Sequence, residues 1–106
     1  MIAAPPPPPP ARVQVVAREF GYALSRQTIK AGWAIIELRN AGEDAHDLLM
    51  RRVGGKRVYL WPATQSGAVA ERELKLLPGI YRLFCGAGNH RALGMQATLV
   101  VTRRAP

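Results

Sequence analysis

Residues 78–85 read Pro-Gly-Ile-Tyr-Arg-Leu-Phe-Cys, a turn signal followed by a strand pattern. Pro78-Gly79 marks the turn, because proline and glycine interrupt regular structure. Tyr81, Leu83 and Cys85 then share one face of the expected strand, since successive side chains of a strand point to opposite sides. The pattern therefore predicts a thiol that points inward at the end of a strand.

A second pattern starts at this cysteine and reads Cys85-x4-His90-x4-Met95. The chain has one cysteine and two histidines, and the other histidine is His46. A thiolate, two imidazoles and a weak axial thioether form the ligand set of a mononuclear blue copper site. We therefore expect one copper ion at these four residues. The alternative is a buried structural thiol with two unrelated histidines.

The rest of the chain consists of short alternating runs separated by turn signals, and no helix is predicted. Strands are expected around residues 13–17, 20–24, 33–40, 46–50, 57–60, 70–76, 81–85 and 95–101. Residues 29–32 resemble a strand end and a turn. The pattern predicts an all-β fold, a Greek-key β-sandwich of about seven to eight strands. His46 and Met95 begin inner faces of their strands, so the four predicted ligands converge at one end.

The domain organisation follows from a run of prolines at residues 5–10. Such a run forms a stiff polyproline II rod, which no packed core can use. We expect a proline-rich linker or tether at residues 1–11 and a single copper-binding domain at residues 12–104. The rod favours a membrane tether through the N-terminus and an ordinary flexible leader equally. No apolar stretch approaches the ~20 residues that span a bilayer.

Charge and motifs exclude several classes of function. The formal net charge is +8 at pH 7, which favours partners with acidic surfaces. The basic residues are scattered and are not interleaved with aromatic residues, so nucleic-acid binding is not expected. The usual catalytic motifs are missing from the sequence, among them Gly-x-Ser-x-Gly, His-Glu-x-x-His and a phosphate-binding loop. We therefore do not expect an enzyme.

With these motifs in place, the chain resembles the cupredoxins, the family of plastocyanin and azurin. The resemblance rests on residues 78–85, on the four ligands, and on Asn-Ala-Gly at residues 40–42 before Ala-His-Asp at residues 45–47. It implies equatorial ligation by His46, Cys85 and His90 and an axial Met95. The ligand loop is longer than that of plastocyanin and similar to that of rusticyanin. Many members carry asparagine where this chain has Asp47.

The resemblance implies a one-electron carrier whose type 1 copper cycles between Cu(II) and Cu(I). Such a carrier would shuttle electrons between extracytoplasmic respiratory partners, such as a c-type cytochrome and a terminal oxidase, through an acidic docking face on the partner. We expect a monomer in the periplasm or another extracytoplasmic space, with or without a membrane anchor. Two alternatives stay open: a periplasmic copper carrier or copper-resistance protein, and a metal-free interaction domain.

Overall fold

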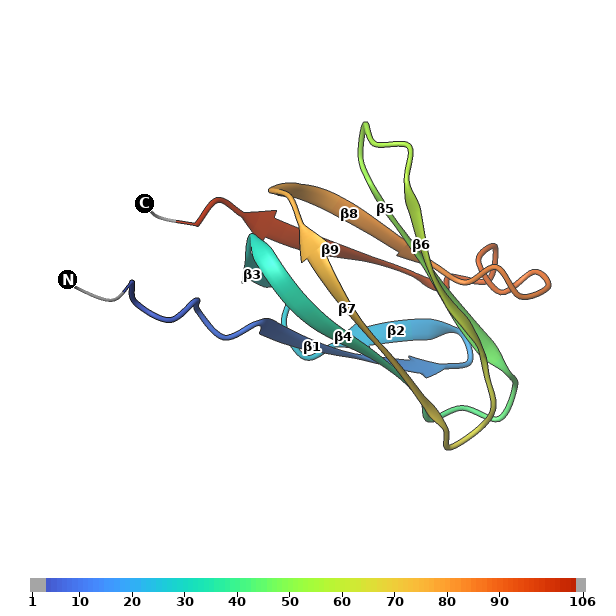
Figure 1. Cartoon of the computed structure of the whole chain (residues 1–106). Coiled ribbons are helices and arrows are strands. Elements are labelled where there is room, and N and C mark those ends of the chain that lie inside the picture. Colours follow the sequence, from blue (N-terminus) through green and yellow to red (C-terminus); the bar gives the residue numbers. More distant parts are fainter. Residues whose placement is uncertain (1–3, 105–106) are drawn as a thin grey trace.

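The computed structural model describes residues 4–104, which form nine strands and no helix (Figure 1). In chain order the strands are β1 (Ala11–Arg18), β2 (Gly21–Leu24), β3 (Thr28–Lys30), β4 (Gly32–Asn40), β5 (His46–Arg52), β6 (Val58–Thr64), β7 (Val69–Leu76), β8 (Gly79–Phe84) and β9 (Gln96–Thr102). They form a four-stranded sheet in the order β2-β1-β4-β7 and a five-stranded sheet in the order β3-β9-β8-β5-β6. The predicted all-β sandwich is thus confirmed.

The described residues form nine strands, and about seven to eight were expected. The difference arises because β3 is a strand of its own. Its three residues, Thr28–Lys30, pair in parallel with β9, and Ile29 is buried opposite Val101. Three residues are too few to show a period-two pattern, so only the pairing with the far end of the chain defines this strand. The first strand begins at Ala11, the last residue of the segment expected to be a linker.

The core lies between the two sheets, where alternate residues of each strand point inward. Alternate residues are buried on three of the strands: Ala34, Ile36 and Leu38 on β4, Leu48 and Met50 on β5, and Tyr81 and Leu83, whose shared face was predicted, on β8. Trp61 of β6 is fully buried, and its indole N–H donates a hydrogen bond of 3.0 Å to the carbonyl oxygen of Ile36 on β4. This bond connects the two sheets.

Strand direction brings three segments to one end of the five-stranded sheet. The end of β8 lies beside the start of β5 and the start of β9, since Phe84 pairs with Leu49 and with Gln96. Residues 85–95 connect β8 to β9 and project beyond this end, as the orange loop in Figure 1 shows. We call them the ligand loop, because they contain three of the four predicted ligands.

Residues 4–10 lie at the opposite end of the molecule from the ligand loop (Figure 1). They form no strand, and residues 4–9 are exposed. Between residues 4 and 104 there is no helix with the length and apolar character that a bilayer crossing demands.

Candidate metal centre

Three of the four predicted ligands meet at the end of the sandwich. One nitrogen of His46, one nitrogen of His90 and the sulfur of Cys85 all lie within 4.8 Å of one another. His46 and Cys85 are buried, and the His90 side chain is 13% exposed. Donor atoms bound to one transition metal at about 2.0–2.3 Å cannot be more than about 4.6 Å apart. The cluster therefore has nearly the size that a single ion requires.

His46, the first residue of β5, is held by a carboxylate from the opposite sheet. Its Nε2 lies 2.9 Å from Oε1 of Glu19, in the turn between β1 and β2. Its Nδ1 is buried and has no hydrogen-bond partner among residues 4–104. An unpaired buried nitrogen is costly in a folded protein unless something else binds it. This nitrogen is therefore the natural metal donor of His46.

His90 shows the same division of its two nitrogens. Its Nδ1 lies 3.6 Å from the sulfur of Cys85, and its Nε2 lies 3.6 Å from a carboxylate oxygen of Asp44. The Phe20 ring packs against the imidazole at a centroid distance of 5.0 Å. In both histidines Nε2 lies near a carboxylate oxygen, which leaves Nδ1 as the nitrogen available to a metal.

The backbone of the ligand loop connects Met95 to the other ligands. The amide of Cys85 donates to the carbonyl oxygen of Met95 at 3.2 Å, and the amide of Met95 donates to the carbonyl oxygen of His90 at 3.1 Å. The Met95 side chain is fully buried. The loop therefore anchors Met95 beside the cluster, and its role as the axial ligand stays a prediction.

Asp47 ties β5 to the ligand loop. Its Oδ1 accepts a hydrogen bond of 2.6 Å from the amide of Gly86, the residue after the thiol. A side chain on Gly86 would place its Cβ 2.9 Å from the end of the Leu49 side chain and 3.2 Å from the carboxylate of Asp47, so a larger residue would make these neighbours shift. The carboxylate thus provides an acceptor that the backbone can use, although it cannot donate.

Tyr22 of β2 also lies beside the thiol. Its hydroxyl donates to the carbonyl oxygen of Asp47 at 2.6 Å. Burial raises the pKa of the Tyr22 phenol far above its usual value, and the neighbouring Cys85 raises it further. Tyr22 therefore stays a neutral phenol next to the cysteine.

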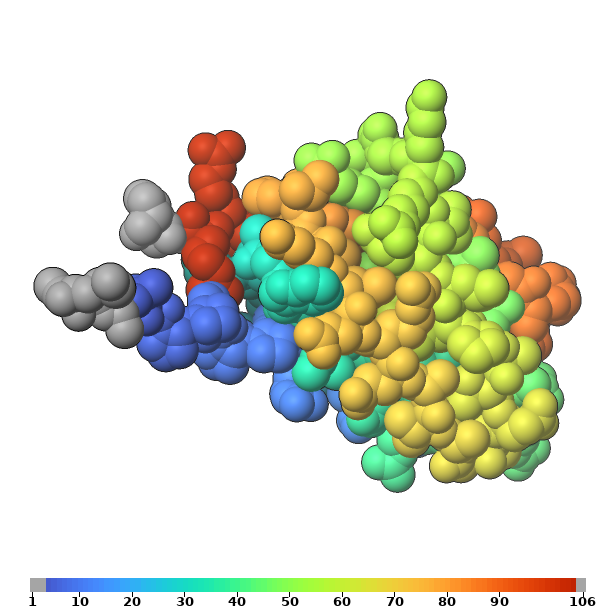
Figure 2. Space-filling view, in the orientation of Figure 1, coloured from blue at the N-terminus to red at the C-terminus, as the bar shows by residue number. Residues whose placement is uncertain are grey.

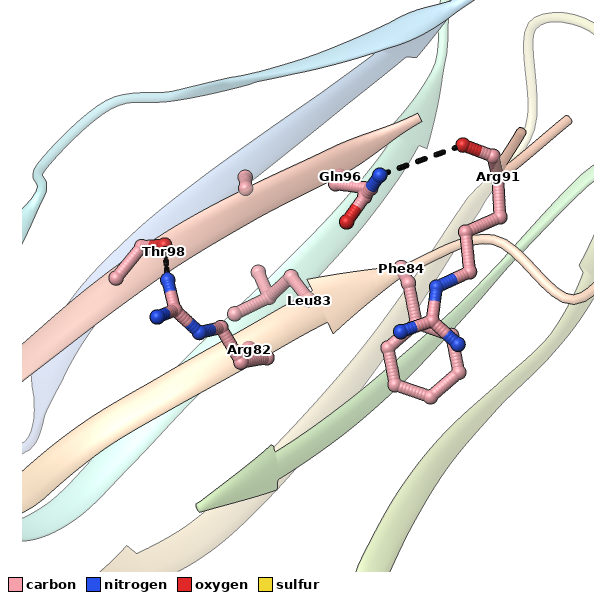
Figure 3. Close-up of a pocket in the computed structure, with 7 residues that line it drawn as sticks. Arg82, Leu83, Phe84, Arg91, Gln96 and Thr98 are labelled. Atoms are coloured by element: carbon pink, nitrogen blue, oxygen red, sulfur yellow. Dashed lines mark hydrogen bonds between the residues drawn. The ribbon is translucent and has the colours of Figure 1, made fainter. Parts of the chain in front are cut away.

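A shallow surface cavity of about 290 Å³ lies next to the ligand loop, on the outer side of β8 and β9 (Figure 3). The Arg91 guanidinium lies 4.2 Å from the centre of the Phe84 ring, where it makes a cation–π contact. Arg82 donates to the hydroxyl of Thr98 at 2.8 Å. The lining includes these two arginines and no carboxylate, so the surface beside the predicted ligands is basic.

The sequence pattern missed the residues that hold the histidines. Glu19 showed no signal in the sequence, because its contact with His46 spans 27 positions and depends on the packing of two sheets. Asp44 precedes β5 by two positions, and its side chain is 56% exposed although it faces His90. Phe20 and Tyr22 were expected only as strand residues.

Known proteins resemble this chain in structure and not in sequence. No family model matches the chain, and no curated protein matches its sequence. A reduced auracyanin from Roseiflexus castenholzii is 15% identical, with a TM-score of 0.72 over 91% of this chain and 98% of that one. Auracyanin A, a "blue" copper protein from Chloroflexus aurantiacus, is 17% identical, with a TM-score of 0.72 over 89% of this chain and 100% of that one.

The same architecture also occurs as a module of larger proteins. A Cu-containing nitrite reductase from Thermus scotoductus is 18% identical, with a TM-score of 0.68 over 92% of this chain and 29% of that one. At such identities the likeness establishes the fold, which both carriers and enzymes use. The chemistry has to be argued from the site.

Proposed function

We propose that this chain, which has the cupredoxin fold, is a one-electron carrier with a mononuclear type 1 copper site. The observation that carries the proposal is the cluster of two imidazole nitrogens and one buried thiol sulfur within 4.8 Å. Bound copper would supply the redox chemistry by cycling between Cu(II) and Cu(I). His46, Cys85 and His90 would provide the three strong ligands and Met95 the weak axial ligand.

The protein would hold the donor atoms in fixed positions and keep water away from them. His46, Cys85 and Met95 are at most 2% exposed, so water has little access to three of the donors. The contact with Glu19 holds His46 at the start of β5, and the hydrogen bond to Asp47 holds Gly86 at the start of the ligand loop. A site that moves little between two oxidation states keeps the cost of electron transfer low. These features support a carrier.

The donor set also supports a carrier over an enzyme. Catalytic metal sites keep an open position for water or substrate. Here a thiolate, two imidazoles and a thioether would occupy the coordination sphere, and no equatorial coordination position would stay open for water or substrate. The proposal therefore assigns this chain the transfer of electrons alone.

Titration of the metal-free protein with Cu(II) tests the proposal. We expect one ion per chain and an intense visible absorption band from the thiolate, which a reductant bleaches and an oxidant restores. Weak binding without this band would favour the copper carrier or copper-resistance protein instead. No uptake of copper would favour a metal-free interaction domain.

We further propose that the redox partners carry an acidic docking face, as a c-type cytochrome or a terminal oxidase could. The net charge of +8, Arg82 next to the ligand loop and Arg91 within it support this part of the proposal. The proposed location is periplasmic or otherwise extracytoplasmic, and it rests on the family resemblance. Fractionation of the native host cells tests the location.

A further inference from the structure

The turn between β1 and β2 contacts the metal cluster, although none of its residues belongs to the predicted ligands. Three side chains of this turn and the adjoining start of β2 contact the cluster or the residue next to it. Glu19 contacts His46, Phe20 packs on His90, and the Tyr22 hydroxyl donates to the carbonyl oxygen of Asp47, the residue after His46. Of these contacts, only the one from Glu19 joins a carboxylate to a ring nitrogen of a predicted ligand.

The carboxylate of Glu19 accepts hydrogen bonds from several donors at once. Its Oε1 lies 2.9 Å from Nε2 of His46, 2.8 Å from the amide nitrogen of Asp44 and 2.9 Å from that of Glu43. Its Oε2 lies 3.1 Å from the Glu43 amide. Both backbone amides can only donate, so the oxygens of Glu19 are acceptors here, and a glutamate side chain is ordinarily ionised at neutral pH.

The turn at residues 42–44 is shaped around this carboxylate. At Gly42 a Cβ atom would lie 2.6 Å from both oxygens of Glu19, so only glycine leaves them room. The fully buried Asn40 supports the same turn, since its side chain accepts from the amide of Gly42 and donates to the carbonyl oxygen of Asp44. Both features keep the backbone amides directed at Glu19.

An ionised carboxylate has no proton to give, so the proton in its contact with His46 must be on Nε2. A neutral imidazole then has a lone pair on Nδ1. This is the buried nitrogen without a partner among the described residues, in a histidine that has one ring nitrogen within 4.8 Å of the thiol sulfur. The tautomer that Glu19 requires is thus the one that a metal needs.

We propose that Glu19 is the positioning residue of the metal centre: it fixes the Nε2–H tautomer of His46, presents Nδ1 to the ion and adds negative charge to that ligand. Carboxylate partners of ligating histidines increase ligand basicity, and their loss typically weakens metal binding 10–100-fold. Extra charge favours Cu(II) over Cu(I), so it lowers the reduction potential. The copper part of this inference rests on the proposed function, and the tautomer part does not.

Two substitutions separate orientation from charge. Glu19→Gln keeps an oxygen that can accept from His46 and from both amides, and it removes the charge. Glu19→Ala removes both. Glu43→Gln is the matched control, because Glu43 is exposed in the turn at residues 42–44 that binds Glu19, and its side chain makes no hydrogen bond or ion pair within residues 4–104.

The first readout needs no metal. The ¹⁵N shifts of the His46 ring in the metal-free protein report which nitrogen carries the proton. We expect the Nε2–H form in the wild type, in Glu19→Gln and in Glu43→Gln, and a mixture of tautomers in Glu19→Ala. An unchanged tautomer in Glu19→Ala would overturn the orienting role. Thermal unfolding of each metal-free variant shows that the fold is kept.

The second readout is the copper-loaded protein. Glu19→Ala should bind copper 10–100-fold more weakly, and Glu19→Gln should have a higher reduction potential than Glu43→Gln. Equal potentials in the two glutamine variants would overturn the charge effect. A wild type that binds copper without the thiolate band refutes the proposed function, while the metal-free shifts still decide the role of Glu19. A wild type that binds no copper refutes the proposed copper site, and with it the proposed effect of Glu19 on copper binding.

Discussion

In the proposed copper site Cys85 is the residue that sets the spectrum, since its thiolate would give the intense visible band of a type 1 centre. Its side chain is 2% exposed at the end of β8. We expect Cys85→Ser to abolish the band and the reversible bleaching, while the metal-free domain still folds, because the alternating strand pattern does not depend on the thiol. Absorption and circular dichroism spectra check this. A visible band that persists in the variant would contradict the assignment.

Met95 tunes the site if it is the axial ligand. A long, weak bond adds little to copper binding, and its electron donation favours Cu(II). We expect Met95→Leu, an apolar exchange of similar volume, to keep copper and to raise the reduction potential. Cyclic voltammetry of the loaded variant measures the change. Loss of all copper, or a lower potential, would place Met95 in the core alone.

At the scale of elements, a side-chain hydrogen bond connects the ligand loop to β5. Asp47 on β5 accepts from the Gly86 amide at 2.6 Å, across 39 positions of the chain. We expect Asp47→Ala to weaken copper binding by about 10-fold or more, because the loop loses its tie. Asp47→Asn is the matched control, since its amide oxygen can accept the same hydrogen bond and copper binding should stay close to that of the wild type.

The ligand loop is also the expected docking surface for the redox partner. Leu93 is 50% exposed on this loop. Arg91, on the same loop, lies over the Phe84 ring (Figure 3). We expect Leu93→Glu to slow electron transfer to an acidic partner with little change in spectrum or potential. Arg91→Glu should lower the association rate mainly at low salt, because charges are screened beyond about 10 Å at 0.1 M. Stopped-flow kinetics at two salt concentrations measure both effects.

A second basic region provides the control for these variants. Arg57, Lys56, Arg52 and Lys75 line a cavity of about 360 Å³ by the hairpin between β5 and β6, which projects from the molecule away from the ligand loop (Figure 2). Arg57→Glu makes the same charge change as Arg91→Glu far from the ligands. If Arg57→Glu slows transfer and Arg91→Glu does not, the docking surface is the hairpin.

At the scale of the whole molecule, the metal centre and the proline-rich segment occupy opposite ends (Figure 1). Residues 5–10 form no strand, and most are exposed. We expect deletion of these residues to change the free energy of unfolding by less than about 0.5 kcal/mol, because no core contact is lost. Urea unfolding of the two metal-free proteins measures the difference. A larger loss would show that the segment belongs to the fold.

The sequence by itself determined the sandwich and the identity of the candidate ligands. Along β4, β5 and β8 the apolar residues recur with a period of two, so the buried faces of these strands could be read locally. Donor atoms are a property of residue type, and this chain has one thiol and two imidazoles to offer. Neither inference needs to know which strands are neighbours.

Only the tertiary structure decided which groups surround those ligands. Glu19 reaches His46 across 27 positions, and β3 exists as a strand because β9 pairs with it. Such contacts depend on how two sheets pack and on strand register, and an exposed turn with a glutamate looks the same in sequence whether or not it meets a histidine. The local sequence therefore identifies the candidate metal donors, and the tertiary structure determines which carboxylates contact them.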